Sequence, residues 1–144
     1  MTKKYLLSVL LSILSISIQA DNLVVVANPN SGIQQLNHNE LVNIYLGRTK
    51  KLPSGVTALP IDLPTNSEQK KLFYEQLVHK SLPEIQAYWA RLLFTGQATP
   101  PVEADNSTEV LNMITHNQGA IAYIDRKKVN SSVIIIYELN KGSN

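Results

Sequence analysis

The sequence predicts a three-layer α/β sandwich with a mostly parallel or mixed sheet of four to five strands and about four helices. Two observations predict this class. Short β-branched runs alternate with longer segments whose apolar residues recur at helical spacing. The longer segments also start with Asn, Ser or Thr followed by Glu three residues later, which is the pattern of a capped helix start.

The first twenty residues have the pattern of a secretory signal peptide. A basic segment, Met1–Lys4, precedes an apolar run from Leu6 to Ile18, and Ala20 precedes the first acidic residue, Asp21. We expect cleavage after Ala20 and a periplasmic domain, with secretion as the other location. The alternative is an uncleaved anchor, although the run is shorter than the roughly 20 apolar residues of a membrane span.

Residues 21–139 are long enough for a single α/β domain with one core, and we expect residues 140–144 to be a disordered tail. Removing the two lysines of the leader from the 13 basic residues leaves 11, equal to the 11 acidic ones. A neutral domain gives no reason to expect nucleic acid or an anionic membrane as a partner. The absence of Cys excludes disulfides, thiolate catalysis and Cys-ligated metal.

The first half of the domain predicts strands and helices in alternation. A β-branched run at 22–27 predicts a buried strand, and Asn37 is the expected N-cap of a helix that ends at Gly47. A second strand is expected at 56–63, where Pro60 predicts an edge position or a bulge. The next helix is expected to start with a capping box of Thr65 and Glu68.

The segment from Ser81 to Gly96 predicts the longest helix. Ser81 and Glu84 have capping-box spacing, and Gly96 is placed to end the helix. We expect the helix to lie across the sheet and to hold it through one apolar face: Ile85, Tyr88, Trp89, Leu92 and Leu93.

The remainder predicts a loop, a helix and two strands. Residues 97–105 are expected to form the loop, and Asn106 to cap a helix that Gly119 ends. Strands are expected at 120–124 and 133–139, separated by a polar loop.

The sequence proposes no catalytic or metal site. The three histidines, His38, His79 and His116, lack metal-ligand spacing and fall at expected helix ends. Neither a nucleophile-elbow motif nor a Gly-rich phosphate loop is present. We therefore expect a protein that is not an enzyme and that uses no cofactor, with an enzyme kept as the less favoured alternative.

Polar helix starts that follow strands are the candidate ligand site. Free backbone N–H groups and the helix dipole attract anions there, and ligands of open α/β sheets lie outside the carboxyl ends of strands. The alternative is ordinary capping, which every helix requires. The candidate oxyanion-binding residues are Asn28, Thr65, Asn66, Ser67, Asn106 and Ser107.

Two basic loops are a second candidate surface. One contains Arg48, Lys50 and Lys51, and the other spans 126–128. Each is typical of a solvated surface, but if the loops were adjacent they would form one positive edge that could dock an acidic partner.

Several motifs together resemble the second lobe of phosphate-type substrate-binding proteins of ABC transporters. They are VVVANP, ELVNIYLGRTKKLPSG, FYEQL, AYWARLLFTG and GAIAYI, spread over residues 23–124. The resemblance implies one lobe of a type II periplasmic binding protein, a periplasmic location and a non-enzymatic role.

The chain departs from that family where the phosphate is held. The family has an R-S-D-G-S-G-T segment after the second strand, and IDLPTNSEQKK stands there in this chain. Thr65 and Ser67 keep hydroxyls near a helix start, but the Arg, the Asp and the glycines are missing. The length also leaves room for one lobe, so a bound anion would be half exposed to water.

These observations lead to two functional hypotheses. The first is a solute-binding or sensory accessory domain with weak affinity for phosphate or another small oxyanion. The second is an interaction module that has lost ligand binding and docks on a membrane sensor, a transporter or an outer-membrane protein. A homodimer in which two lobes rebuild a cleft is a third alternative.

Overall fold

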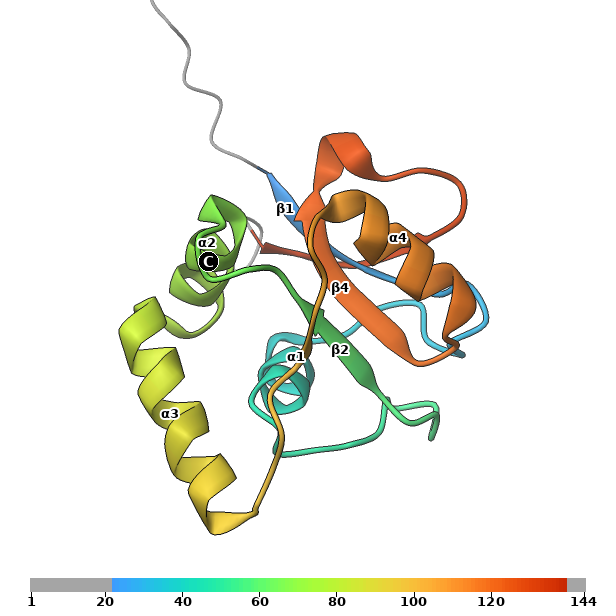
Figure 1. Ribbon diagram of the computed structural model, residues 1–144. Coiled ribbons are helices and arrows are strands. Elements are labelled where there is room, and N and C mark those ends of the chain that lie inside the picture. Colours follow the sequence, from blue (N-terminus) through green and yellow to red (C-terminus); the bar gives the residue numbers. More distant parts are fainter. Residues whose placement is uncertain (1–21, 140–144) are drawn as a thin grey trace, which may run out of the picture.

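The computed structural model describes residues 22–139, so the expected signal peptide and C-terminal tail lie outside the described residues (Figure 1). The expected order of strands and helices is confirmed, with one short strand and one 3₁₀ turn in addition. The elements are β1 (Leu23–Ala27), α1 (His38–Tyr45), β2 (Leu59–Asp62), α2 (Glu68–Val78), α3 (Leu82–Thr95), β3 (Val102–Glu103), α4 (Ser107–His116), β4 (Ala120–Asp125), η1 (Arg126–Lys128) and β5 (Ile134–Glu138).

The five strands form one mixed sheet in the order β3-β2-β4-β1-β5. β2 pairs in parallel with both β3 and β4, whereas β1 pairs antiparallel with β4 and β5. β1 lies inside the sheet, and all five of its residues are buried. This burial on both faces explains why β1 is a continuous apolar run without alternation.

Helices cover both faces of the sheet. α4 crosses in front of β4 in Figure 1, and its Val110 and Ile114 are buried. On the opposite side, α1 and α2 contribute Tyr45 and Phe73 to a cluster of rings with Tyr123 of β4. The Phe73 and Tyr123 rings stack with their centroids 4.0 Å apart. The three-layer arrangement expected from the sequence is therefore present.

The helix starts agree with the sequence in three of four cases. Asn37, Ser81 and Asn106 are the N-caps of α1, α3 and α4, and Asn37 forms a full capping box with Glu40. The expected box of Thr65 and Glu68 is wrong, because α2 begins two residues later with Ser67 as its N-cap. Three polar residues in a row each offer a capping oxygen, so sequence spacing alone does not select one.

β2 is shorter than expected and does not lie at an edge. It spans 59–62 between β4 and β3, and β3 itself falls within the segment expected to be a loop. Pro60 is tolerated because β3 pairs only with Ile61 and Asp62, so the proline has no partner on that side. Gly119 was expected to end α4, but α4 stops at His116 and Gly119 lies in the turn before β4. A Cβ at Gly119 would lie 1.8 Å from the Thr57 carbonyl oxygen.

α3 does not lie across the sheet as expected, and its expected apolar face is only partly buried. Ile85 and Trp89 are buried, whereas Leu93 is 51% exposed. The helix lies at the periphery of the domain beside α2 (Figure 1), and the Tyr88 hydroxyl donates to the Leu46 carbonyl oxygen at 2.6 Å. A Cβ at Gly47 would lie 2.9 Å from the Trp89 ring, so the end of α1 and α3 meet at a position that needs glycine.

We expect Trp89→Ala to lower the free energy of unfolding by about 3–5 kcal/mol, because the 7%-exposed ring would leave a cavity between α1 and α3. Urea denaturation followed by circular dichroism measures the change. Phe94→Ala is the matched control on the same helix, since Phe94 is 94% exposed. Its effect should stay within about 0.5 kcal/mol, and equal effects of the two substitutions would contradict this account of α3.

Candidate functional site

Three parallel strands end at one edge of the sheet, and two helices begin there. β2, β3 and β4 run in the same direction, so Asp62, Glu103 and Asp125 all lie at their carboxyl ends. α2 follows β2, and α4 follows β3. We call this region, residues 62–68, 103–109 and 125–128, the carboxyl edge.

The fold brings five of the six predicted site residues to the carboxyl edge. Thr65, Asn66 and Ser67 precede or cap α2, while Asn106 and Ser107 open α4. Thr65 and Asn66 are exposed. Because β2 and β3 are hydrogen-bonded neighbours as far as Asp62 and Glu103, the two polar segments that follow them begin side by side.

Two of these five side chains already serve as caps. The Ser67 hydroxyl accepts the Lys70 amide at 3.3 Å, and the Asn106 side-chain oxygen accepts the Glu109 amide at 3.0 Å. The Glu109 carboxylate in turn accepts the Asp105 amide at 2.6 Å. Ordinary capping therefore accounts for the Ser67 and Asn106 oxygens, and the Ser67 hydroxyl also donates to Gln69 at 3.1 Å. The donors left for a ligand come from Thr65, Asn66, the Asn106 side-chain amide, the Ser107 hydroxyl and the remaining backbone amides.

Asn28 does not lie at the carboxyl edge, and the expectation that it shares that rim is wrong. β1 runs antiparallel to β4, so its end points the opposite way. The Asn28 side-chain amide donates to the Ile114 carbonyl oxygen at 2.8 Å, near the end of α4, and its oxygen accepts the Asn30 amide at 2.7 Å. Asn28 is buried and holds the turn after β1 against α4.

A buried carboxylate, Asp62, anchors the carboxyl edge. Its Oδ1 accepts hydrogen bonds from the Tyr123 hydroxyl and from the Leu63 amide at 3.0 Å. Its Oδ2 accepts the Tyr74 hydroxyl at 2.7 Å and lies 3.6 Å from the Lys70 ammonium nitrogen. Both oxygens are thus occupied by donors, which is the condition for keeping a charged group in the interior.

The tyrosines around Asp62 have raised pKa values. Burial raises the pKa of Tyr45, Tyr74 and Tyr123 well above the ordinary value of 10.0, and the charge of Asp62 raises each pKa further. These hydroxyls therefore remain neutral donors throughout the physiological range. The Tyr45 hydroxyl donates to the Ile61 carbonyl oxygen at 2.9 Å, next to the same carboxylate.

Asp62 and Lys70 were missed by reasoning from the sequence. The available signal was an acidic residue between Ile61 and Leu63 in an otherwise apolar strand, because a buried carboxylate needs donors nearby. The tyrosines that supply them come from positions 12 and 61 residues further along the chain. No spacing rule links residues so far apart.

A cavity of about 380 Å³ opens beside Asp62 and Lys70, between the end of β2 and α3. Its walls are mostly apolar. Thr65 lines it, which joins the cavity to the predicted site. The other lining residues include Leu82, Ile85, Trp89, Leu93, Pro100, Pro101 and Glu103.

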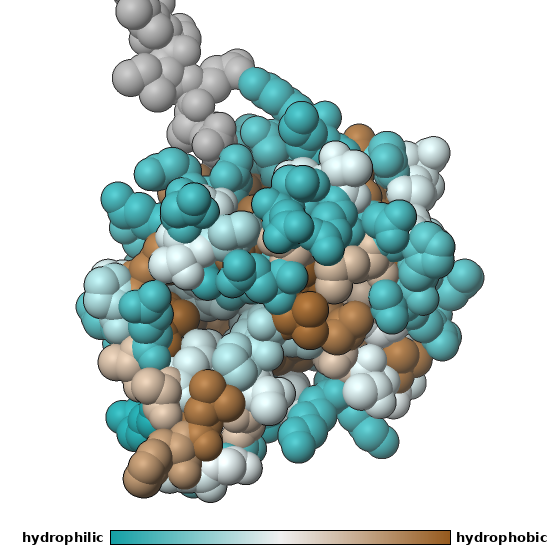
Figure 2. Space-filling view, in the orientation of Figure 1, coloured by the Kyte–Doolittle hydropathy of each residue, from teal (hydrophilic) through white to brown (hydrophobic). Residues whose placement is uncertain are grey.

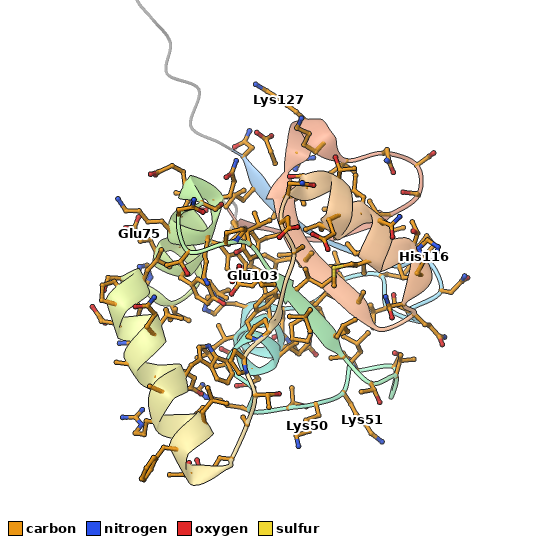
Figure 3. The ribbon with its side chains drawn as sticks, viewed as in Figure 1. Lys50, Lys51, Glu75, Glu103, His116 and Lys127 are labelled. Atoms are coloured by element: carbon orange, nitrogen blue, oxygen red, sulfur yellow. The ribbon has the colours of Figure 1, made fainter. Side chains whose placement is uncertain are left out.

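The two basic loops do not meet. Figure 3 shows Lys127 at the top of the molecule, on the carboxyl edge, and Lys50 and Lys51 at the bottom. The single positive edge considered from the sequence is therefore absent. Residues 22–139 also contain no group of three or more His, Asp or Glu side chains that could hold a metal ion, and no helix among them is long and apolar enough to cross a membrane.

Comparison with solved structures identifies the fold. The chain superposes on an ABC-type phosphate transport receptor from Vibrio cholerae with a TM-score of 0.65 and 17% identity, over 81% of this chain and 45% of that one. It superposes on PstS from Borrelia burgdorferi with a TM-score of 0.62 and 15% identity, over 81% and 47%. A Clostridium perfringens substrate-binding protein with bound phosphate gives a TM-score of 0.64 at 17% identity, over 81% and 44%.

The structural neighbours are thus phosphate ABC transporter substrate-binding proteins, and the resemblance seen in the sequence is confirmed for the fold. This chain spans less than half the length of each of these proteins, so it is a partial, single-lobe-sized form. No family model and no curated relative matches the sequence.

We expect Tyr74→Phe and Tyr123→Phe each to lower the free energy of unfolding by about 1–3 kcal/mol, because each leaves Asp62 with one donor fewer. Chemical denaturation measures the loss. Tyr137→Phe is the matched control, since among the described residues its hydroxyl bonds only the exposed His38 ring, at 3.2 Å. If all three changes were equally mild, the carboxylate would not depend on its tyrosine donors.

Stability should fall above pH 10. The three core tyrosines have a raised pKa in the folded state, so above the ordinary value of 10.0 the unfolded chain releases protons that the folded chain keeps. Their contribution is complete below pH 10 and is lost as pH rises beyond it. Ultraviolet titration should show these tyrosines ionising together with unfolding; smooth ionisation of every tyrosine in a folded protein would contradict the burial.

Proposed function

We propose that this protein is a solute-binding or sensory accessory domain whose ligand-facing surface is the carboxyl edge. The observation that carries the proposal is the convergence of two polar helix starts, at Thr65–Ser67 and Asn106–Ser107, on the edge where parallel strands end. Ligands of open α/β sheets lie at such edges. Two structural neighbours, a phosphate transport receptor and a substrate-binding protein with bound phosphate, support an anion as the ligand class.

The proposed ligand class is phosphate or another small oxyanion, bound weakly. Backbone amides and hydroxyls at helix starts favour an anion. The carboxylates of Glu68 and Glu109, in the first turns of α2 and α4, repel an anion at the same helix starts. The Lys70 ammonium group already pairs with Asp62, so its charge is not free for the anion. One lobe also leaves the anion in contact with water, where hydrogen bonds contribute little net free energy.

The second candidate is an interaction module that has lost ligand binding. The Ser67 hydroxyl and the Asn106 side-chain oxygen already serve as caps, and this occupancy is the observation that favours it. Such a module would dock on a membrane sensor, a transporter or an outer-membrane protein. A homodimer, in which two lobes would form one cleft between them, is the third candidate. Crosslinking in the native compartment and light scattering separate these alternatives.

Isothermal titration calorimetry with inorganic phosphate is the direct test. We expect binding in the millimolar range, about −4 kcal/mol, and a further loss in Thr65→Ala and Asn66→Ala, because both exposed side chains border the α2 start. Thr99→Ala removes a matched hydroxyl near Lys50, at the other end of the molecule, and should leave binding unchanged. No heat at millimolar phosphate from a folded protein would exclude the oxyanion proposal and favour the interaction module.

A further inference from the structure

The C-terminal end of α3 presents large apolar side chains to solvent. Phe94 is 94% exposed and Leu93 is 51% exposed, although both belong to a regular helix. Figure 2 shows hydrophobic residues gathered at this end, at the lower left of the view. Because the Phe94 side chain is almost fully exposed, it contributes little to the stability of the fold.

The two segments that form this end, residues 46–58 and 85–102, carry positive charge and no acidic residue, and Glu84 and Glu103 flank the second of them. They contain Arg48, Lys50, Lys51 and Arg91. All four basic side chains are exposed, and within residues 22–139 none forms an ion pair. We call these two segments the basic apolar end.

Packing holds the two segments together. Gly47 sits against the Trp89 ring, and the Tyr88 hydroxyl bonds the Leu46 carbonyl oxygen. A cavity of about 280 Å³ between them is lined by Lys50 from one segment and Pro100 from the other. Figure 3 shows Lys50 and Lys51 pointing away from the body at the end where α3 terminates.

We propose that the basic apolar end binds an anionic lipid surface, with Phe94 and Leu93 entering the headgroup region and the four basic side chains lying against lipid phosphates. Aromatic and Leu side chains flanked by Lys and Arg are the composition of an interfacial membrane contact. Each Lys or Arg near an anionic bilayer adds about 1 kcal/mol of attraction, which corresponds to about fivefold in affinity.

A lipid surface fits these observations better than a protein partner. Phe94 is 94% exposed at a helix end, and a bilayer accommodates such a side chain without a shaped pocket. The near-neutral composition does not oppose the contact, because Asp62, Glu103 and Asp125 all end strands at the carboxyl edge. The fold thus keeps these three carboxylates away from Lys50 and Lys51, although Arg126, Lys127 and Lys128 also lie at the carboxyl edge.

The proposed contact leaves the helix starts at the carboxyl edge free, although Leu93 also lines the cavity beside Asp62. In Figure 3 Lys127, on that edge, and Lys50, at the basic apolar end, lie at opposite ends of the molecule. A domain held at the membrane by one end would expose its helix starts to solution. The lipid proposal does not require the solute proposal, since each concerns a different surface.

Vesicle sedimentation tests the proposal. The protein is used in its exported form, with the N-terminus established by mass spectrometry and identical in every variant. We expect binding to phosphatidylglycerol vesicles, none to phosphatidylcholine vesicles, and release at about 1 M salt, where the Debye length is about 3 Å. Phe94→Ser should weaken binding about tenfold or more through the lost apolar contact.

A charge-matched pair of variants makes the test specific. Lys50→Gln with Lys51→Gln should weaken binding to the anionic vesicles about 25-fold, at about fivefold per lysine. Lys127→Gln with Lys128→Gln removes the same charge from the opposite end and should leave binding unchanged. Circular dichroism confirms that these exposed substitutions leave the fold intact.

Equal losses in the two double variants would overturn the proposal, since attraction would then depend on net charge alone. If Phe94→Ser bound the anionic vesicles as well as the unchanged protein, the proposed insertion of Phe94 into the headgroup region would be wrong. Retention on a soluble acidic polypeptide without vesicle binding would assign this end to a protein partner in place of lipid.

Discussion

The arrangement of the carboxyl edge depends on the hydrogen bonds and the ion pair of the buried Asp62 carboxylate. Its two oxygens collect donors from β4, from α2 and from the chain that follows β2. A carboxylate taken from water is tolerated only when its partners are all in place, and removing one partner leaves a buried group unsatisfied. The same contacts that make burial possible therefore fix where α2 starts relative to the sheet.

The local features of the fold could be predicted from the sequence, and the long-range ones could not. Three N-caps and the apolar runs of β1 and β4 follow from residues close together in the chain. The direction of β1, the two-residue β3 and the peripheral position of α3 depend on which elements pack together, so no local pattern reports them. Leu93 shows the difference, because it has core periodicity but faces solvent.

The candidate site was predicted in part for the same reason. Thr65, Asn66, Ser67, Asn106 and Ser107 follow or cap elements that the strand order places side by side. Asn28 was placed on the wrong edge, because that inference assumed a strand parallel to its neighbours. The clustering of acidic residues at strand ends and of basic and apolar residues at the other end emerges only in three dimensions, and it divides the surface between two distinct proposals.

The central claim is that the carboxyl edge is the surface that meets the solute. A phosphate titration followed by amide chemical shifts in heteronuclear NMR tests it most directly, because it reports binding residue by residue. The account predicts shifts at Thr65–Ser67 and Asn106–Ser107, with the amides of residues 48–51 unchanged. Shifts confined to residues 48–51, or no shifts at millimolar phosphate, would contradict it.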